Sequence, residues 1–263
     1  MPQRACCAGS SAIMRGCGAE SDRSPAGNGV RSGRVPQISI VMPVLNEAPV
    51  IEQALRALQT LRASGHELIV VDGGSSDDSA RLAASLADRV LNSERGRANQ
   101  MNHGARAARG AVLLFLHADA SLPERAAQLM LEEMARTGRH WGRFDIRIDS
   151  TRWVLRIVGA LMNLRSRLTG ICTGDQAIFV SRELFLGAGG FPPIALMEDI
   201  ALSRKLRRVS APLCLAAAVR TSARRWERDG TVRTILLMWW LRLRYFFGAS
   251  PSHLARIYDG RRP

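Results

Sequence analysis

Apolar residues in the first half of the chain recur with two different periods. Short, mostly apolar runs are typical of buried strands in a parallel sheet, and they occur at 38–44, 67–72, 90–91 and 111–116. Segments with apolar residues at helical spacing lie between and after these runs, at 48–64, 75–87, 97–108 and 123–136. This alternation predicts an α/β fold in which helices flank a mostly parallel central sheet.

The second half is less regular, but both periods also appear in it. Its predicted strands are 144–149, 176–180 and 213–219, and its predicted helices are 152–168, 199–209 and 231–247. We expect three regions: a disordered leader at 1–36, which lacks periodicity, an α/β domain at 37–228, and a C-terminal helical segment at 229–263. The predicted helix at 231–247 is strongly apolar and amphipathic, and arginines interrupt it.

The composition suits a globular chain with an excess of positive charge. Of the 263 residues, 46% are hydrophobic, and Lys plus Arg outnumber Asp plus Glu by 37 to 23, with Lys205 as the only lysine. Much of the excess follows residue 203, beside aromatic and aliphatic residues, which favours an anionic membrane surface over a nucleic acid. The five cysteines lack zinc-like spacing, and no apolar run is long enough to span a membrane. We therefore expect a cytoplasmic protein that binds the membrane peripherally.

Ligands of parallel α/β sheets bind beyond the carboxyl ends of the strands, so the residues after each predicted strand are the first candidates for chemistry. Asp72 ends one strand and precedes Gly73 and Gly74, so its carboxylate could accept hydrogen bonds from a base or a ribose. A turn that caps the next helix explains the same residues equally well. The spacing is not that of a dinucleotide-binding glycine loop.

His117 and Asp119 follow the strand at 111–116, and a carboxylate there would point into the ligand crevice. Asp119 could hold Mg²⁺ or Mn²⁺ bridging the diphosphate of a nucleotide, with His117 as a second ligand or a phosphate contact. The alternative for Asp119 is the cap of the following helix. Arg95 and Arg97 lie at a helix start, which is a natural site for an anion, although a solvated helix face is as good an explanation.

Two further clusters lie later in the chain. Asp199, with Glu198 beside it, follows a turn rich in Gly and Pro and could act as a general base, or the two could cap a helix. Arg224, Arg225 and Trp226 precede the C-terminal apolar helix. Arginine pairs with phosphate, and tryptophan stacks on a sugar ring or anchors a chain at a membrane interface.

Together these segments resemble family 2 glycosyltransferases with a GT-A fold, from about Ser39 to Asp259. The resemblance rests on Ser39–Glu47, Val70–Asp77, Asn102–Gly104 with Ala108–Gly110, and Gly189–Phe191 followed by Glu198–Asp199. Leu116–Asp119 and Thr221–Trp226 also resemble a bacterial subgroup described as selenodomain-associated transferases.

The resemblance implies a role for each candidate residue. Nucleotide binding falls to Pro43, Glu47, Asp72, Arg95 and Arg97; metal binding to Asp119 and His117; base catalysis to Asp199 with Glu198; and acceptor or phosphate binding to Arg224, Arg225 and Trp226, which look similar to a (Q/R)xxRW motif. His117 stands where the family's metal-binding DxD motif has its first carboxylate. Imidazole is a softer ligand than carboxylate, which favours Mn²⁺ over Mg²⁺.

The sequence therefore predicts a metal-assisted, inverting transfer of a sugar from a UDP- or GDP-sugar to an acceptor hydroxyl, with a lipid-linked acceptor among the candidates. A nucleotidyltransferase is the rival enzyme, but the sequence has no Gly-rich triphosphate loop with a signature lysine. A non-catalytic module that binds a nucleotide-sugar or a membrane is the rival of another class. A nucleic-acid-binding protein ranks third, and its affinity should fall steeply with salt.

Overall fold

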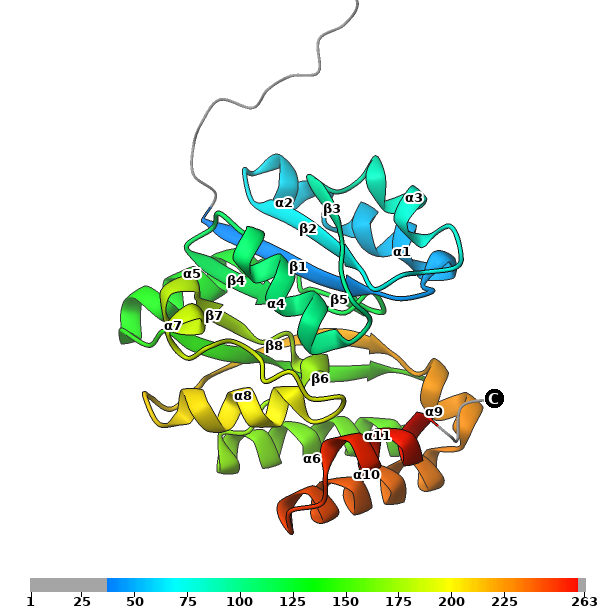
Figure 1. The fold of residues 1–263 in the computed structure, drawn as a ribbon. Helices are drawn as coiled ribbons and strands as arrows, with labels where there is room; N and C mark the ends of the chain where they lie inside the picture. Colours follow the sequence, from blue (N-terminus) through cyan, green and yellow to red (C-terminus); the bar gives the residue numbers. More distant parts are fainter. Residues whose placement is uncertain (1–36, 260–263) are drawn as a thin grey trace, which may run out of the picture. The chain divides into compact units, whose positions relative to one another are not determined.

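A curled sheet of eight strands forms the centre of the described chain, which covers residues 37–259 of this computed structural model (Figure 1). The leader expected at 1–36, the last four residues and the side chain of Arg225 lie outside the described part. The strand order is β3-β2-β1-β4-β7-β6-β8-β5. The strands are β1 (Ile38–Val44), β2 (Glu67–Asp72), β3 (Arg89–Asn92), β4 (Val112–Phe115), β5 (Ala120–Ser121), β6 (Trp141–Asp149), β7 (Phe179–Ser181) and β8 (Leu213–Ser222).

Helices connect and cover these strands. They are α1 (Ala48–Ala57), α2 (Gln59–Ala63), α3 (Ser79–Ala84), α4 (Arg97–Ala107), α5 (Ala126–Thr137), α6 (Trp153–Thr169), α7 (Arg182–Gly187), α8 (Glu198–Arg207), α9 (Arg224–Asp229), α10 (Thr231–Phe246) and α11 (Pro251–Asp259), with a 3-10 turn η1 at Gly174–Gln176. The helix predicted at 48–64 is divided at Leu58, which is buried in the core. The structure adds β5, α7, α9 and α11, which the pattern did not predict.

Parallel pairing is confined to part of the sheet. Strands β3, β2, β1 and β4 pair in parallel, as the first half of the sequence predicts. Strand β7 then runs antiparallel to β4 and to β6, while β6 and β8 pair in parallel and β5 is antiparallel to β8. Three antiparallel pairings thus interrupt the parallel order, and each involves a strand from the half of the chain where the hydrophobic pattern is irregular.

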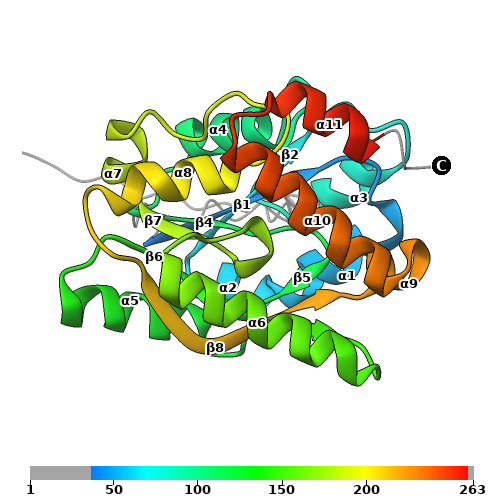
Figure 2. The same ribbon diagram turned by 90° about the horizontal axis from the view of Figure 1, so that it is seen from below.

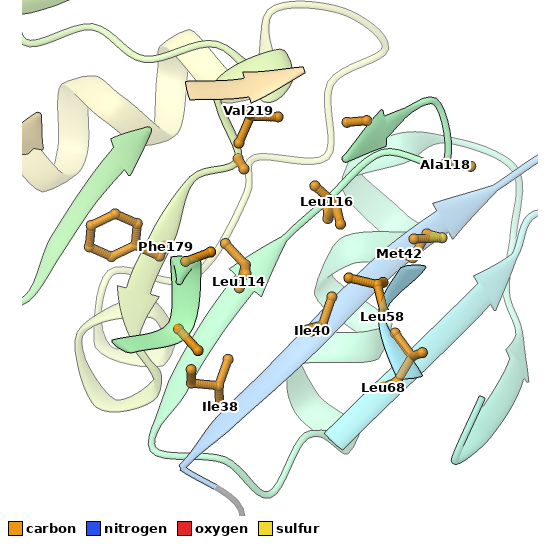
Figure 3. Close-up of a cluster of buried hydrophobic side chains, with 14 of the residues drawn as sticks. Ile38, Ile40, Met42, Leu58, Leu68, Leu114, Leu116, Ala118, Phe179 and Val219 are labelled. Atoms are coloured by element: carbon orange, nitrogen blue, oxygen red, sulfur yellow. The ribbon is translucent and has the colours of Figure 1, made fainter. Parts of the chain in front are cut away.

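Each face of the sheet carries its own hydrophobic core, because side chains alternate along a strand. On β1, Ile38, Ile40 and Met42 face a core formed with α1, α3 and α5 (Figure 3). Val41 faces the opposite core, which α4, α7 and α8 cover. Gly104 allows helix α4 to lie close to the sheet, since a Cβ atom at this position would stand 2.4 Å from Val41 Cγ1.

Helices α6, α8, α10 and α11 gather on one side of the sheet (Figures 1 and 2). Buried residues at the start of α8 pack against α10 and α11, and Leu196, Leu241 and Leu254 are the centre of that cluster. None of the helices between residues 37 and 259 has the length and hydropathy needed to cross a bilayer.

Replacing Gly104 by Ala should destabilise the fold, because the added methyl group would overlap Val41 on β1. Overpacking of this kind costs about 1–3 kcal/mol. Gly187→Ala is the matched control, since a Cβ atom there meets nothing within 4 Å. Urea unfolding of both variants measures the difference, and equal stabilities would show that α4 can move away from the sheet without cost.

Candidate active site

A cavity opens at the carboxyl ends of β1 and β4. The chain progresses from β1 toward β2 and β3 on one side and returns to β4 on the other, so these two strands form the topological switch point where ligands bind in such sheets. The cavity has a volume of ≈1240 Å³. Residues expected to bind ligand that line it are Pro43, Glu47, Arg95, Arg97, His117, Asp119 and Trp226.

Gln100, which also lines the cavity, ties the start of α4 to the ends of two strands. Its side chain is buried, and Nε2 donates hydrogen bonds to Val44 O on β1 (2.7 Å) and Val71 O on β2 (2.8 Å). A Cβ atom on Gly73 would stand 2.9 Å from the Gln100 side chain, so the glycine after Asp72 makes room for this bridge. The bridge fixes the N-terminus of α4, and with it Arg97, at the rim of the cavity.

Strand β8 brings the late Arg-Trp cluster beside Asp119. Thr221 on β8 pairs with Ala120 on β5, and Ser222 N donates to Asp119 O. Beyond the strand, Arg224 approaches Glu47, with Nη2 and Oε2 3.7 Å apart. Burial raises the pKa of Glu47, and repulsion from Asp119 adds to this shift. Residues separated by more than 170 positions in the sequence thus share one electrostatic environment, at the mouth of β1 and β4.

His117 lies against η1. The ring is so close to Gly174 that a Cβ atom there would stand 2.6 Å from Nε2. Burial lowers the pKa of His117, while the nearby carboxylates, Asp175 first among them, act in the opposite direction. Neutral imidazole is the form that can accept a hydrogen bond or bind a metal.

A smaller hollow adjoins the main cavity and contains the expected base. Glu198 and Asp199 line it, and it shares Arg97, His117 and Asp175 with the main cavity. Asp199 Oδ2 accepts a hydrogen bond from Gly174 N (2.9 Å), and Oδ1 accepts one from Ile200 N (2.7 Å). These bonds orient the carboxylate and leave lone pairs for another proton donor.

Glu198 is buried and forms an ion pair with Arg97, whose Nε lies 3.1 Å from Oε1. The other oxygen, Oε2, has no hydrogen-bond partner among the described residues. Burial raises the pKa of Glu198, and the charge of Arg97 opposes that shift. The pair links the start of α4 to the start of α8 across the site.

Like Arg224, Asp72 is an expected ligand-binding residue that lines neither hollow. Its Oδ2 accepts hydrogen bonds from Gly74 N (3.0 Å) and Ser75 N (2.9 Å), and its Oδ1 accepts one from Ser75 Oγ (2.5 Å). This is the local turn that the sequence offered as the alternative. A nucleoside contact by Asp72 stays a prediction.

Four titratable side chains that line the main cavity were not predicted as site residues from the sequence. They are Asp175, Arg165, Arg242 and Tyr258. Asp175 follows a glycine just before a strand, in a turn that no hydrophobic period marks. Arg165 and Arg242 interrupt helices that are otherwise apolar. An arginine in such a helix was the one feature of the sequence that could have identified these two residues.

The acidic and imidazole groups suit a cation that the ligand helps to hold. No group of three or more His, Cys, Asp or Glu side chains within 37–259 is placed to bind a metal by itself. Mg²⁺ and similar ions commonly take only one or two protein carboxylates and complete their shell with water and substrate phosphates. The exposed Asp119, with His117 nearby, fits that kind of site.

Comparison with known proteins agrees with the fold. The family model for glycosyl transferase family 2 matches residues 39–181, which is more than half of the chain and includes the ends of β1, β2 and β4. The chain belongs to glycosyl transferase family 2. A relative in this family, the PGL/p-HBAD biosynthesis glycosyltransferase of Mycobacterium bovis (strain BCG / Pasteur 1173P2), is 33% identical over 165 residues. The match covers 57% of this chain and 61% of the relative, so it spans less than two thirds of that protein's length.

Solved structures share the fold of this family 2 chain. The mannosyltransferase PcManGT of Pyrobaculum calidifontis, in complex with GDP-Man and Mn²⁺, matches with a TM-score of 0.54 and 23% identity over 71% of this chain and 57% of that one. TarS of S. aureus, in complex with UDP, matches with a TM-score of 0.60 and 16% identity over 71% and 60% of the two chains. The expected GT-A type of α/β fold is confirmed.

Proposed function

We propose that this protein transfers a sugar from a nucleoside-diphosphate sugar to an acceptor hydroxyl group, with inversion at the anomeric carbon. The observation that carries the proposal is the pair of adjoining hollows at the switch point of the sheet, which bring Asp119 and Asp199 to one site. Family membership and the GDP-Man and UDP bound in two structural neighbours support the choice of donor.

The donor nucleotide binds at the carboxyl end of β1. Pro43 and Glu47 line the cavity there, and Asp72 ends the neighbouring strand. Asp72 would contact the nucleoside once the local turn that its carboxylate now stabilises has opened. Arg95 and the N-terminus of α4 attract the diphosphate, because helix N-termini and arginine both favour anions. Arg97 forms an ion pair with Glu198, and the position of this pair limits how far the diphosphate enters the cavity.

Asp199 is the general base of the reaction. It removes the proton of the acceptor hydroxyl, whose oxygen then attacks C1 of the sugar from the face opposite the diphosphate. A C1–O bond to the acceptor forms as the C1–O bond to the diphosphate breaks, and the nucleoside diphosphate leaves with both electrons of that bond. Glu198 stands beside the base and, through Arg97, keeps α8 in place.

Asp119 and His117 would hold a divalent cation, Mn²⁺ or Mg²⁺, together with the donor. When bound, the cation would neutralise charge that builds up on the leaving diphosphate. Arg224, Arg225 and Trp226 bind the acceptor or the phosphates on the far side of Asp119. Trp226 also packs against Ile148 and Leu155, which holds the cluster at the cavity wall.

The acceptor is carried by a lipid, and α10 rests on the anionic membrane surface that holds it. Large apolar side chains of α10 that do not line the cavity, namely Val232, Leu236 and Phe246, are more than half exposed, and arginines flank them. Basic and aromatic residues together favour such a surface.

Replacing Asp199 by Asn should lower kcat by about 10²–10⁴, because the amide cannot accept the proton. Donor binding should stay unchanged, since Asp199 contacts the acceptor side. Release of nucleoside diphosphate and titration with UDP- and GDP-sugars measure the two quantities. Asp78→Asn, at an exposed carboxylate paired with Arg81 on the surface, is the matched control. Full turnover in Asp199→Asn would exclude Asp199 as the base, and release of pyrophosphate from a triphosphate would favour a nucleotidyltransferase.

Mn²⁺ should bind tightly only together with a nucleoside diphosphate, because the described protein ligands are too few to hold the ion alone. Electron paramagnetic resonance of Mn²⁺, with and without UDP or GDP, measures free and bound ion directly. Asp119→Asn should abolish the ternary complex, and Asp78→Asn should keep it. Tight Mn²⁺ binding without nucleotide, or an unchanged Asp119→Asn variant, would contradict the proposed site.

Vesicles of anionic phosphatidylglycerol should sediment the protein, and vesicles of phosphatidylcholine should not. Substituting Leu236 and Phe246 together by Gln should weaken binding by about tenfold or more, since each large side chain contributes about 1.5–3 kcal/mol when fully buried. Val209→Gln changes an exposed apolar residue just after the C-terminal end of α8 and should have no effect. Protein that stays in the supernatant with both kinds of vesicle would contradict membrane association.

A further inference from the structure

The main cavity is larger than a single small ligand requires. Pockets for such ligands have volumes of about 300–1,000 Å³, whereas this one measures ≈1240 Å³. Beyond the donor end, it continues between α6 and α10, whose side chains form two facing apolar walls. From α6 the wall includes Trp153, Ile157, Leu161, Leu164 and Leu168, and from α10 it includes Ile235, Met238, Trp239 and Leu243.

Polar contacts hold the inner side of α6 on the sheet. Asn163 Oδ1 accepts a hydrogen bond from Ile146 N (2.9 Å), and Nδ2 donates to Ile146 O (3.0 Å) on β6. The fully buried Arg143 adds a bond from Nε to Ser166 Oγ (3.1 Å). The apolar side of α6 is therefore free of core packing, and Trp153 is 69% and Leu168 78% exposed.

Helix α10, like α6, packs against the protein on one side and leaves its cavity-lining side uncovered. Leu241 packs against Leu254 in the cluster formed with α11 and α8. On the side that lines the cavity, Trp239 is 68% exposed and Leu243 is 55% exposed. Two firmly seated helices thus present an unfilled apolar groove (Figure 2 shows both helices on the same side of the sheet). Such a groove suits a long apolar chain, because burial of each CH₂ group stabilises by about 0.8 kcal/mol in general.

Two arginines lie where this groove reaches the reacting end of the cavity. Arg165 comes from α6 and Arg242 from α10, and the Nε atom of each is buried without a hydrogen-bond partner in the described residues. Among the side chains that the structure describes, no carboxylate lies within ion-pair distance of either guanidinium. Burial and the charge of Arg242 lower the pKa of Arg165 to about 10, and burial also lowers the pKa of Arg242.

A pair of like charges enclosed in this way is unfavourable unless an anion completes it. Asp199 and Asp175 are close enough to attract both guanidinium groups, but they line the reacting end and form no ion pair with them. Guanidinium groups match phosphate in shape and charge, so the missing partner has phosphate chemistry.

We propose that the acceptor is a phosphate-bearing lipid, with its apolar chain in the groove between α6 and α10 and its phosphate on Arg165 and Arg242. The hydroxyl that receives the sugar lies beyond the phosphate, at Asp199. The proposal rests on the proposed function and names the acceptor class for it. It also assigns Arg165 and Arg242 as specificity-determining residues, separate from the donor contacts at β1 and α4.

Lysophosphatidylglycerol tests the proposal, because it carries one chain, one phosphate and hydroxyl groups beyond it. Monoacylglycerol with the same chain lacks the phosphate and is the matched ligand. Below the micelle concentration, tryptophan fluorescence of the full chain reports binding through Trp153 and Trp239 in the groove. Wild type should bind the phospholipid at least about tenfold more tightly than monoacylglycerol, as expected for hydrogen bonds to a charged group.

Arg165→Met and Arg242→Met, singly and together, should remove that preference and leave monoacylglycerol binding within about twofold, since the methylene stems are kept. The variants should fold, because they replace buried charges by apolar groups. Arg156→Met on α6 and Arg233→Met on α10 are matched controls at exposed positions and should change nothing. Equal affinity of wild type for the two lipids would overturn the proposal.

Two further measurements separate the other sources of phosphate. Weaker UDP or GDP binding in the double variant would assign the arginines to the donor instead of the acceptor. Loss of vesicle binding with unchanged binding of monomeric lysophosphatidylglycerol would assign them to bilayer headgroups. Nucleoside diphosphate binding by wild type tests the proposed function independently: if it is absent while the phospholipid preference persists, the donor assignment fails and the lipid site stands.

Discussion

The site depends on the parallel register of β1 with its two neighbours. Val44 pairs with Asp72 on one side, and Val41 pairs with Phe115 on the other, so three strands end at the same edge of the sheet. Gln100 then bonds to the carbonyl groups of both Val44 and Val71, which brings the start of α4 to that edge. A shift of one residue in any of these pairings would turn the strand-end side chains to the other face. Register, more than any single contact, therefore determines where a ligand can bind.

The antiparallel half of the sheet supplies the other wall. Because β7 runs antiparallel to β4, the chain just before β7 lies at the carboxyl end of β4. There η1 places Gly174 against His117, and Gly174 N donates a hydrogen bond to Asp199. Strand β8 is parallel to β6, and β6 and β4 both run antiparallel to β7, so β8 ends at the same edge as β4 and brings Arg224 toward Glu47.

Charged groups that are shielded from solvent and incompletely paired lower the stability of the fold, and in this protein they lie at the ligand site. Glu198 is buried with only one oxygen paired, and Arg165 and Arg242 are half-buried, each with a buried Nε atom that has no hydrogen-bond partner among the described residues. Apolar residues at these positions would make a more stable core. The two arginines come from helices whose apolar sides are also left uncovered, so the unfavourable charges and the unfilled surface lie in one cavity.

The α/β class, the parallel pairing in the first half of the chain and the family could all be predicted from the sequence, because buried strands and their polar ends follow one another locally. It also pointed to Asp119 and Asp199, whose neighbours in the chain mark a strand end and a helix start. Only the tertiary structure decided which late segments meet these residues. The meeting of Arg165 with Arg242, or of Asp175 with His117, depends on long-range packing of α6, α10 and η1. No local period records such contacts, since side chains distant in the chain become neighbours only when the strands pair and the helices close over them.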